Sequence, residues 1–532
     1  MKKKEIILLI LILFIAAFFR LWQLNSIPPG LYPDVAINGN EALGSLKTAP
    51  PVGGFKLFYP ENNGREGLMI WLIALSFSIF GVSIWSIKII AAVIGILTVL
   101  GLYSFTKELF NNSTLQHYNN PTIIALLTSF FLAISFWHTN FSRIGFRAIL
   151  VPFILVFAFY FLFKGLHEKR TLYFIISGIF FGLGFYTYIS YRFIVFLLPL
   201  VLIFEWFIYR KQNLQKQFLK FAICNLTFTI LVALPIGIYF FQHPQDFIGR
   251  AVPISIFTAE NPIKEFGKSL ILHLGMFNFY GDGNWRHNFA GSPQLFWLIG
   301  ILFLIGIFFS IKELLASIKE KNCSLFTVHC LLLSWFFIML LPGILTYEGI
   351  PHALRTIGVI PVVYIFAGLG AFYTYKWFNQ NVKSKKLLIL ASLIFLLMTA
   401  TLQFNKYFIQ WASHPEVKGA FSSDYVKMGN YLNSLSPEIQ KYVIVNMPGV
   451  PVPYPSGIPM PAQTVMFIEN TKFGQPQSIY LLPENLDKIK LDDKKKVIVP
   501  MKYDENLFNE LAQKFPQGKI TRENEILIYE IK

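Results

Sequence analysis

The sequence predicts an α-helical protein that crosses a membrane about eleven times and ends in a small α/β domain outside the cytoplasm. Three observations lead to this prediction. The chain has 532 residues, of which 54% are hydrophobic and only 14% are charged, whereas soluble domains usually carry about 25% charged residues. Apolar runs long enough for membrane-spanning helices recur between residues 6 and 408. Lys and Arg gather in every second connection between these runs, as expected when those connections lie in the cytoplasm.

The composition also excludes several classes of protein. Phe alone occurs 56 times, which is more apolar surface than a soluble enzyme of this length could bury, and a disordered protein would contain few aromatic residues. The formal net charge is +17. The basic residues are spread along the chain and form no single patch that would bind a nucleic acid. We therefore attribute the charge to the cytoplasmic ends of membrane helices. The cysteines Cys224, Cys323 and Cys330 lie in or beside apolar segments, so we expect no disulfide framework.

The first apolar run covers residues 6–24 and follows a cationic start at residues 1–4. A cleaved signal peptide would be the alternative. The length of the run, the interfacial residues Arg20 and Trp22, and the lack of a small-x-small cleavage pattern favour a retained helix with a cytoplasmic N-terminus. The predicted location is therefore the plasma (inner) membrane, crossed several times.

Ten further runs are predicted to span the membrane. They lie at residues 82–106, 121–141, 148–164, 171–191, 193–209, 219–240, 294–311, 324–345, 356–375 and 387–408. With the N-terminus in the cytoplasm, alternation puts every Lys-rich connection there as well, including the one that holds Lys383, Lys385 and Lys386. This agreement is the main support for the predicted topology.

One apolar stretch, residues 67–80, is not counted as a span. It has about 14 residues, a length that favours an interfacial or re-entrant segment. If it crossed the membrane, every later Lys-rich connection would move outside. We therefore expect an interfacial helix within an outer loop at residues 25–81, and a second outer loop at 241–293.

Two domains are expected, a transmembrane domain at residues 1–411 and an extracytoplasmic α/β domain at residues 412–532. The second domain is polar and alternates helical stretches with β-like runs. The helical stretches are 425–435 and 507–515, and the β-like runs are 442–445, 497–499 and 526–529.

Polar residues that could do chemistry gather on the predicted outer side. They are Asp34, Glu41, Arg65 and Glu66 in the first loop, Lys88 at the start of the second span, and Arg143, Arg147, Tyr188, Arg192, Asp282, Arg286, His287, Asn288, His352 and Arg355 in later connections. Structural explanations exist: Asp34 could cap a helix, and an interfacial Arg or Lys could extend its charge to water. Several guanidinium groups at one outer depth, framed by aromatic rings, nevertheless indicate a lipid-borne anion such as phosphate.

Six short motifs resemble those of the GT-C superfamily of membrane glycosyltransferases, in the family 39 branch of protein O-mannosyltransferases and lipid A aminoarabinose transferases. The motifs are Leu-Tyr-Pro-Asp at 31–34, Asn-Gly-Arg-Glu at 63–66, Ser-Arg-x-Gly-Phe-Arg at 142–147, Tyr-Thr-Tyr-x-x-x-Arg at 186–192, Gly-Asp-x-x-x-Arg-His-Asn at 281–288 and Pro-His-x-x-Arg at 351–355. Their order, spacing and shared outer location extend the resemblance over about residues 5–375.

The resemblance implies a GT-C-like fold and a specific reaction. Such enzymes move a sugar from a polyprenyl-monophosphate carrier to a hydroxyl or amine of an extracytoplasmic acceptor, usually with inversion at the anomeric carbon. It implies that Asp34 is the catalytic base. An acidic residue commonly follows that Asp in the family pattern, but this chain has Val35 there, so Glu66 or Glu41 would have to supply a second carboxylate.

The reaction also accounts for the residue types. A leaving phosphate needs charge stabilisation rather than protonation, so one carboxylate base suffices beside several cations. We expect the donor phosphate to be bound by Arg143, Arg147, Tyr188, Arg192, His352, Arg355 and Lys88. Further substrate contacts are expected from Arg65, Glu41, Asp282, Arg286, His287 and Asn288.

No cofactor is expected. The first loop contains no dense acidic cluster, and His287 and His352 are not spaced as a zinc motif. Transfer is therefore predicted to be independent of metal, with a divalent ion as the open alternative.

Other classes of function stay open. A transporter or flippase of a lipid-linked sugar would be expected to show repeated halves and charges at mid-membrane depth, which this sequence does not show. A non-catalytic membrane scaffold would not need the outer arginines. The acceptor could be a lipid, a glycan or a protein, and membrane lipid rather than nucleic acid is the expected surrounding.

Overall fold

The computed structural model describes residues 3–47, 54–111, 120–249, 251–452, 457–490, 492–523 and 525–531. Met1 and Lys2 of the predicted cationic start lie outside the described residues. The chain divides into two compact units, each built from two separate segments. We call Met1–Leu24 with Ala91–Ser413 the helical unit, and Asn25–Ile90 with His414–Lys532 the mixed unit.

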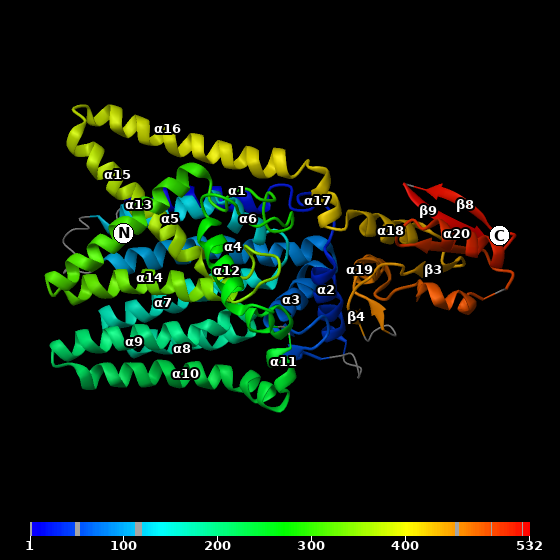
Figure 1. The fold of residues 1–532 in the computed structure, drawn as a ribbon, viewed down its shortest axis with the longest axis horizontal. Helices are drawn as coiled ribbons and strands as arrows, with labels where there is room; N and C mark the ends of the chain where they lie inside the picture. The colour runs from blue at the N-terminus through cyan, green and yellow to red at the C-terminus, as the bar shows by residue number, and fades with distance from the viewer. Residues whose placement is uncertain are drawn as a thin grey trace. The chain divides into compact units, whose positions relative to one another are not determined.

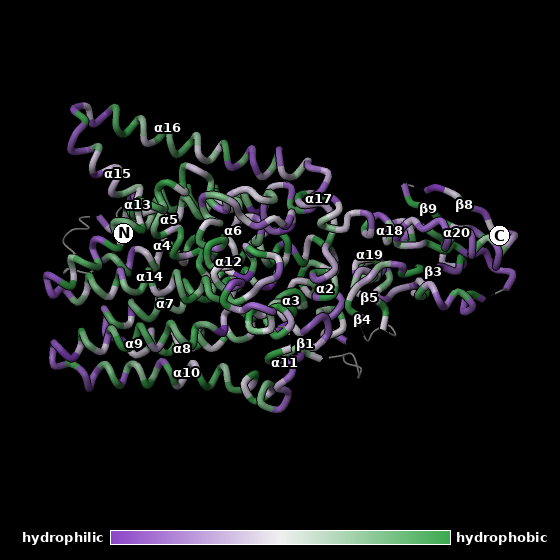
Figure 2. Tube along the Cα trace, viewed as in Figure 1, coloured by the Kyte–Doolittle hydropathy of each residue, from purple (hydrophilic) through white to green (hydrophobic). Residues whose placement is uncertain are grey.

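The helical unit consists of long apolar helices. Among all described residues of the chain, eight helices are long and apolar enough to cross a membrane, and three apolar helices are shorter, of which Leu68–Phe80 belongs to the mixed unit. In chain order the helices are α1 (Lys3–Leu21), α4 (Ile84–Phe110), α5 (Pro121–Ile134), α6 (Phe136–Phe141), α7 (Leu150–Glu168), α8 (Thr171–Leu183), α9 (Ile194–Lys211), α10 (Gln215–Gln242), α11 (Pro244–Ile248), α12 (Pro262–Gly275), α13 (Trp297–Lys319), α14 (Cys323–Ile344), α15 (Ile360–Asn381) and α16 (Lys385–Phe404). Hydrophobic residues run along the long helices, and hydrophilic ones mark their turns (Figure 2).

The predicted class, a polytopic α-helical membrane protein with a strand-containing C-terminal domain, is confirmed. Each predicted span coincides with helix, although the number of crossings stays a prediction. Two spans differ from expectation. The helix predicted over 171–191 ends at Leu183 and is followed by short 3₁₀ turns on either side of Tyr188, whose backbone is extended (φ −151°, ψ 145°). The helix predicted over 121–141 breaks at Ser135. The backbone of Ser135 is extended (φ −60°, ψ 125°), and its hydroxyl accepts a hydrogen bond from the His138 amide at the start of α6.

Helices α13 and α15 pack at unusually close range through glycines. An added Cβ would lie 1.8 Å from the Phe366 carbonyl oxygen at Gly306 and 1.8 Å from the Leu302 carbonyl oxygen at Gly370. Small residues that let two backbones approach are a common means of helix packing in membranes, where van der Waals contact replaces the hydrophobic effect. Helices α7, α8 and α10 lie side by side in the same unit (Figure 1).

The C-terminal part of the mixed unit is a five-stranded sheet with helices on both faces. The strand order is β6 (Ile479–Leu481), β3 (Gln440–Ile444), β7 (Lys496–Pro500), β9 (Ile526–Ile531) and β8 (Lys519–Glu523). The first three strands are parallel and the last two antiparallel to their neighbours. Helices α18 (Ser423–Ser434) and α19 (Ala462–Phe473) cover one face, and α20 (Glu505–Lys514) covers the other.

The N-terminal part of the mixed unit is the first loop. It contains α2 (Pro33–Leu46), the short hairpin β1 (Phe58–Tyr59) and β2 (Arg65–Glu66), and α3 (Leu68–Phe80). Helix α3 coincides with the predicted interfacial stretch, whose position at a membrane surface stays a prediction.

The first loop packs against α19. The Asn40 amide donates to the Gln463 side-chain oxygen at 2.8 Å and accepts from Asn470 at 2.8 Å. The sequence-based division assigned this loop to the membrane domain instead. In the structure the first loop and the C-terminal domain belong to one compact unit. Hydrogen bonds between amide side chains of α2 and α19 contribute to this packing.

We expect Gly370→Ala to destabilise the chain, since its methyl group would meet the Leu302 carbonyl and force α13 and α15 apart. Overpacking of this kind typically costs about 1–3 kcal/mol. Gly237→Ala on α10 is the matched control, because nothing lies within 4 Å of its added Cβ. Thermal unfolding of both variants in detergent checks the prediction, and equal midpoints would contradict it.

Candidate active site

Asp34 lies in the first turn of α2, at the start of the first loop. Pro33 occupies the first helical position, where its missing N–H costs nothing, and Tyr32 is the N-cap residue. No side chain caps this helix end, so the alternative that Asp34 is merely a cap is wrong. The carboxylate is half-buried and accepts a hydrogen bond from the Asn62 side-chain amide at 3.0 Å.

Asn62 was not predicted as a site residue. It belongs to the turn between β1 and β2, where Asn62, Asn63 and Gly64 all have positive φ angles. The Asn-Asn-Gly run is a typical turn signal, but no local pattern indicates that this turn contacts Asp34.

Arg65, predicted as a substrate contact, is fully buried within the first loop. It donates to Asn38 Oδ1 at 2.9 Å, to Glu41 Oε1 at 2.9 Å and to the Glu61 carbonyl at 3.2 Å. These bonds tie the hairpin to α2, so its donors serve the fold of the loop. Glu66, the next residue along β2, is buried as well.

Glu41 pairs with Arg65 but is not held in its charged form. Burial raises the pKa of the Glu41 carboxyl to about 7, because loss of hydration outweighs the attraction of Arg65. Glu41 therefore titrates near neutral pH inside the first loop.

Lys88 lies near the start of α4 and is also buried. Its Nζ donates to the Pro28 carbonyl at 2.8 Å, and only 1% of the residue is exposed. The alternative interpretation, in which Lys88 extends its charge into water, is therefore wrong.

Three predicted residues of the helical unit meet in one cluster. Asp282 Oδ2 lies 2.9 Å from His287 Nδ1 and 3.8 Å from His352 Nδ1. The Ala353 amide donates to the same carboxylate oxygen at 2.8 Å. Asp282 thereby joins the outer loop after α12 to the connection between α14 and α15.

Other groups hold this cluster in place. The His352 amide donates to His273 Nε2 at 3.2 Å, and Asn288 donates to the Asp282 carbonyl at 3.2 Å. Burial, followed by electrostatic interaction with His287 and Arg355, keeps the pKa of His352 well below its usual value. Burial also lowers the pKa of His273 to about 4. His273 was not predicted, because a lone histidine on α12 carries no spacing signal.

The cluster has a donor set that could hold a divalent metal. The ligand atoms of Asp282, His287 and His352 all lie within 4.8 Å of one another, and donors around a tetrahedral zinc ion are roughly 3.3 Å apart. One carboxylate and two imidazoles suit zinc or iron. The spacing argument against a metal missed this arrangement, because the two histidines come from connections far apart in the sequence.

Arg143 is the clearest departure from the predicted phosphate site. It is fully buried, and its terminal nitrogens donate to the carbonyls of Phe19 at 3.0 Å and Trp22 at 2.7 Å, at the end of α1. Its guanidinium also lies 5.1 Å from the ring centre of Phe408. These contacts assign Arg143 to helix packing, which corrects its predicted contact with phosphate.

The other predicted arginines lie in different surroundings. Arg147 stacks on Tyr188 with 5.3 Å between its Cζ and the ring centre. Arg192 lies over Phe247 at 4.3 Å and donates to its carbonyl. Arg355 donates to the Thr346 hydroxyl at 2.9 Å and to the Glu348 carbonyl at 2.7 Å.

The structure therefore places Arg355 and Arg286 beside the Asp282 cluster, where both lower the pKa of His352. Arg147 with Tyr188 forms a separate pair. Aromatic rings contact the guanidinium groups of Arg147 and Arg192, and a hydroxyl and a backbone carbonyl accept hydrogen bonds from Arg355.

We expect the first loop to lose stability as the pH rises through Glu41. The pKa of this group is raised on folding, so its stabilising contribution is complete below its ordinary value of 4.5 and is lost as the pH reaches about 7. The loss amounts to at most about 3 kcal/mol. Thermal midpoints of the native chain and Glu41→Gln between pH 5 and 8 measure it.

The variant should give the flatter pH profile. Glu510→Gln, which removes an exposed carboxylate of the same unit, should follow the native profile. Parallel profiles for all three proteins would disprove the assignment to Glu41.

Comparisons with known proteins agree with this fold. Residues 68–239 match the family model described as dolichyl-phosphate-mannose-protein mannosyltransferase. No curated protein sequence matches the chain. ArnT from Cupriavidus metallidurans bound to undecaprenyl phosphate is similar in structure, with a TM-score of 0.56, 11% identity and coverage of 99% of this chain and 97% of ArnT. The apo form of ArnT gives a TM-score of 0.57 at the same identity and coverage.

The oligosaccharyltransferase of Archaeoglobus fulgidus, tethered to an acceptor peptide, matches with a TM-score of 0.51 and 15% identity. The match covers 82% of this chain but only 58% of the archaeal enzyme. At these identities the structural likeness shows the fold, and the family model matches the segment from α3 to α10, about a third of the chain. The chain thus has the fold of ArnT and of the archaeal oligosaccharyltransferase, and part of its membrane region is similar to the protein mannosyltransferases.

Proposed function

We propose that this protein is an inverting glycosyltransferase that moves a sugar from a polyprenyl monophosphate to an acceptor outside the cytoplasm. The observation that carries the proposal is the state of Asp34. Its carboxylate is half-buried, caps no helix end, and within the described residues takes a side-chain hydrogen bond from Asn62 alone. One carboxylate oxygen is thus left to take a proton from an acceptor.

In the proposed reaction, the acceptor oxygen or nitrogen attacks the anomeric carbon of the sugar. Its proton passes to Asp34, and the bond between the anomeric carbon and the phosphate oxygen breaks on the opposite face. The polyprenyl phosphate leaves with a second negative charge. Cations near that oxygen stabilise it, so no acid needs to protonate the leaving group.

We propose that the phosphate is bound by residues of the helical unit, namely Arg147, Arg192 and Arg355, with Tyr188, His352 and Arg286 as further candidates. Lys88 of the mixed unit stays a candidate from the sequence alone. ArnT bound to undecaprenyl phosphate, a lipid of this class, supports the choice of donor through the shared fold. Arg143 leaves the set, since its donors are used at the end of α1.

The remaining assignments follow the predicted topology. The N-terminus is proposed to be cytoplasmic and residues 412–532 extracytoplasmic, because this orientation puts every Lys-rich connection in the cytoplasm. Glu66 is proposed as the second carboxylate of the first loop. The acceptor is a lipid, glycan or protein, and the transfer step uses no metal.

We expect Asp34→Asn to lose transfer activity, because an amide cannot accept the acceptor's proton. Removing a general base typically costs about 100- to 10,000-fold in rate. The assay uses the full chain in lipid with a panel of labelled polyprenyl-phosphate sugars and follows release of free prenyl phosphate. A chelator in a parallel sample should leave the rate unchanged.

Asp424→Asn is the matched control, because it removes an exposed carboxylate of the same unit (82% side-chain exposure) and should keep full activity. Turnover that survives Asp34→Asn would exclude Asp34 as the base. Donor movement across the membrane without prenyl phosphate release would favour the flippase alternative instead.

We expect the arginines to separate into two groups. Arg147→Gln and Arg355→Gln should each lower donor turnover by about tenfold or more, the worth of a charge-assisted hydrogen bond. Arg143→Gln should instead lower the thermal midpoint, because it leaves carbonyls at the end of α1 without donors, at a cost of about 1–3 kcal/mol. Turnover and unfolding are measured on the same preparations.

Lys216→Gln, at an exposed cation on α10, should change neither quantity. If the combined neutral substitution of Arg147, Arg192 and Arg355 left donor turnover intact, the phosphate assignment would be wrong.

A further inference from the structure

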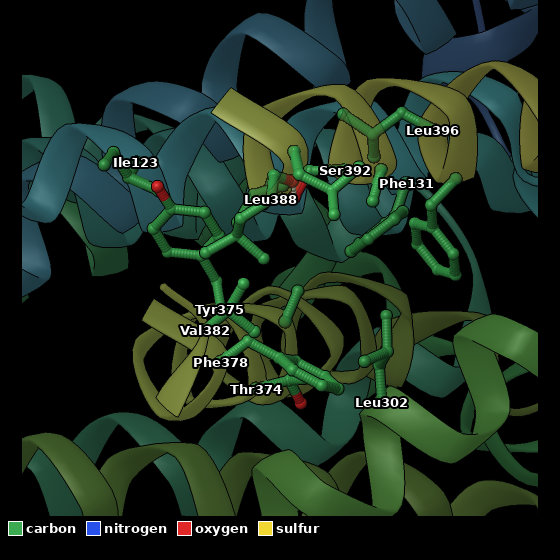
Figure 3. A pocket seen from close by; sticks show the side chains of 15 residues that line it. Ile123, Phe131, Leu302, Thr374, Tyr375, Phe378, Val382, Leu388, Ser392 and Leu396 are labelled. Carbon is green, nitrogen blue, oxygen red and sulfur yellow. Dashed lines mark hydrogen bonds between the residues drawn. The ribbon is translucent and has the colours of Figure 1, made fainter. Parts of the chain in front are cut away.

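An apolar cavity of about 590 Å³ lies among α5, α13, α15 and α16 of the helical unit. Its walls are almost entirely hydrocarbon, and Figure 3 shows Leu388 and Leu396 of α16 facing Tyr375 and Phe378 of α15 across it. The volume falls in the range of about 300–1,000 Å³ that is usual for binding pockets. The lining is suited to a lipid chain and contains no charged side chain.

Helix α16 forms one wall but packs poorly elsewhere. Only 17% of the apolar stretch of this helix is buried inside the protein, the lowest share among the eight candidate spans of the described residues. An apolar helix that leaves a cavity of this size beside it loses van der Waals contacts on that side. A flexible lipid chain in the cavity would restore them.

Positive charge stands at one end of the cavity. Val382 and Leu387 both line the cavity. The four residues between them include Lys383, Lys385 and Lys386, which are all exposed. No Asp or Glu occurs from residue 349 to 415, so the segment itself supplies no counter-charge.

The placement of these lysines opposes the helix dipole. Lys385 and Lys386 lie in the first turn of α16, where the positive end of a helix favours an anion and disfavours a cation. Lys385 donates to the Asn379 and Val382 carbonyls, whereas Lys383 and Lys386 form no ion pair with any described residue. An anionic group at this helix end would relieve the repulsion.

We propose that this cavity is a binding site for an anionic phospholipid, with an acyl chain between α15 and α16 and a phosphate head group on the lysines. Basic sites between membrane helices bind such head groups. The positive charge of the lysines favours a lipid with an anionic head group over a neutral lipid. The site is separate from the proposed transfer reaction and shares none of its residues.

Native mass spectrometry of the full chain in detergent tests this proposal, with phosphatidylglycerol and phosphatidylcholine added in equal amounts. The native chain should retain phosphatidylglycerol preferentially. The triple variant Lys383→Gln, Lys385→Gln, Lys386→Gln should lose this preference by about tenfold or more, since each lysine near an anionic lipid contributes measurably. Ala371→Phe, which fills the cavity, should weaken retention as well.

The matched control is Lys211→Gln, Lys216→Gln, Lys220→Gln, which removes three exposed lysines near the connection between α9 and α10. It should retain phosphatidylglycerol as the native chain does. Equal retention of both lipids, or a preference unaffected by the first triple variant, would overturn the proposal. Displacement of phosphatidylglycerol by equimolar undecaprenyl phosphate would show that the cavity serves a prenyl chain instead. Circular dichroism confirms that each variant is folded.

Discussion

The hydrocarbon interior of a membrane offers no water, so every backbone carbonyl freed at a helix end must find a donor inside the protein. Two buried arginines supply such donors, each to carbonyls at the end of another helix. Arg20 on α1 donates to the Leu132 and Ala133 carbonyls at the end of α5. Arg143, which follows α6, donates back to carbonyls at the end of α1. The break at Ser135 and the packing of these helices depend on this pair.

The same requirement distinguishes the surroundings of two arginines. The terminal nitrogens of Arg143 donate to backbone carbonyls at and just after the end of α1, whereas the guanidinium of Arg147 stacks on the ring of Tyr188. The carboxylates differ in the same way: Glu41 accepts a hydrogen bond from the buried Arg65, while Asp34 accepts one from the neutral amide of Asn62.

Much of the fold was predictable from sequence, because apolar length and Lys-rich connections report directly on membrane helices. The helices and strands of residues 412–532 also carried clear local patterns, although α19 was missed. Interactions between distant segments were not predictable. Nothing local marks the Asn40 contacts with α19, the approach of His287 to His352, or the carbonyls that receive Arg143, since each depends on the assembled fold.

The pairing of α2 with α19 has a consequence for how the protein is made. The helix that carries Asp34 is among the first parts of the chain to leave the ribosome, yet Gln463 and Asn470, which satisfy it, are among the last. Its final packing must wait until nearly the whole chain has been synthesised. A chain cut short before α19 would retain its membrane helices but lack the partners that satisfy Asn40 of the first loop.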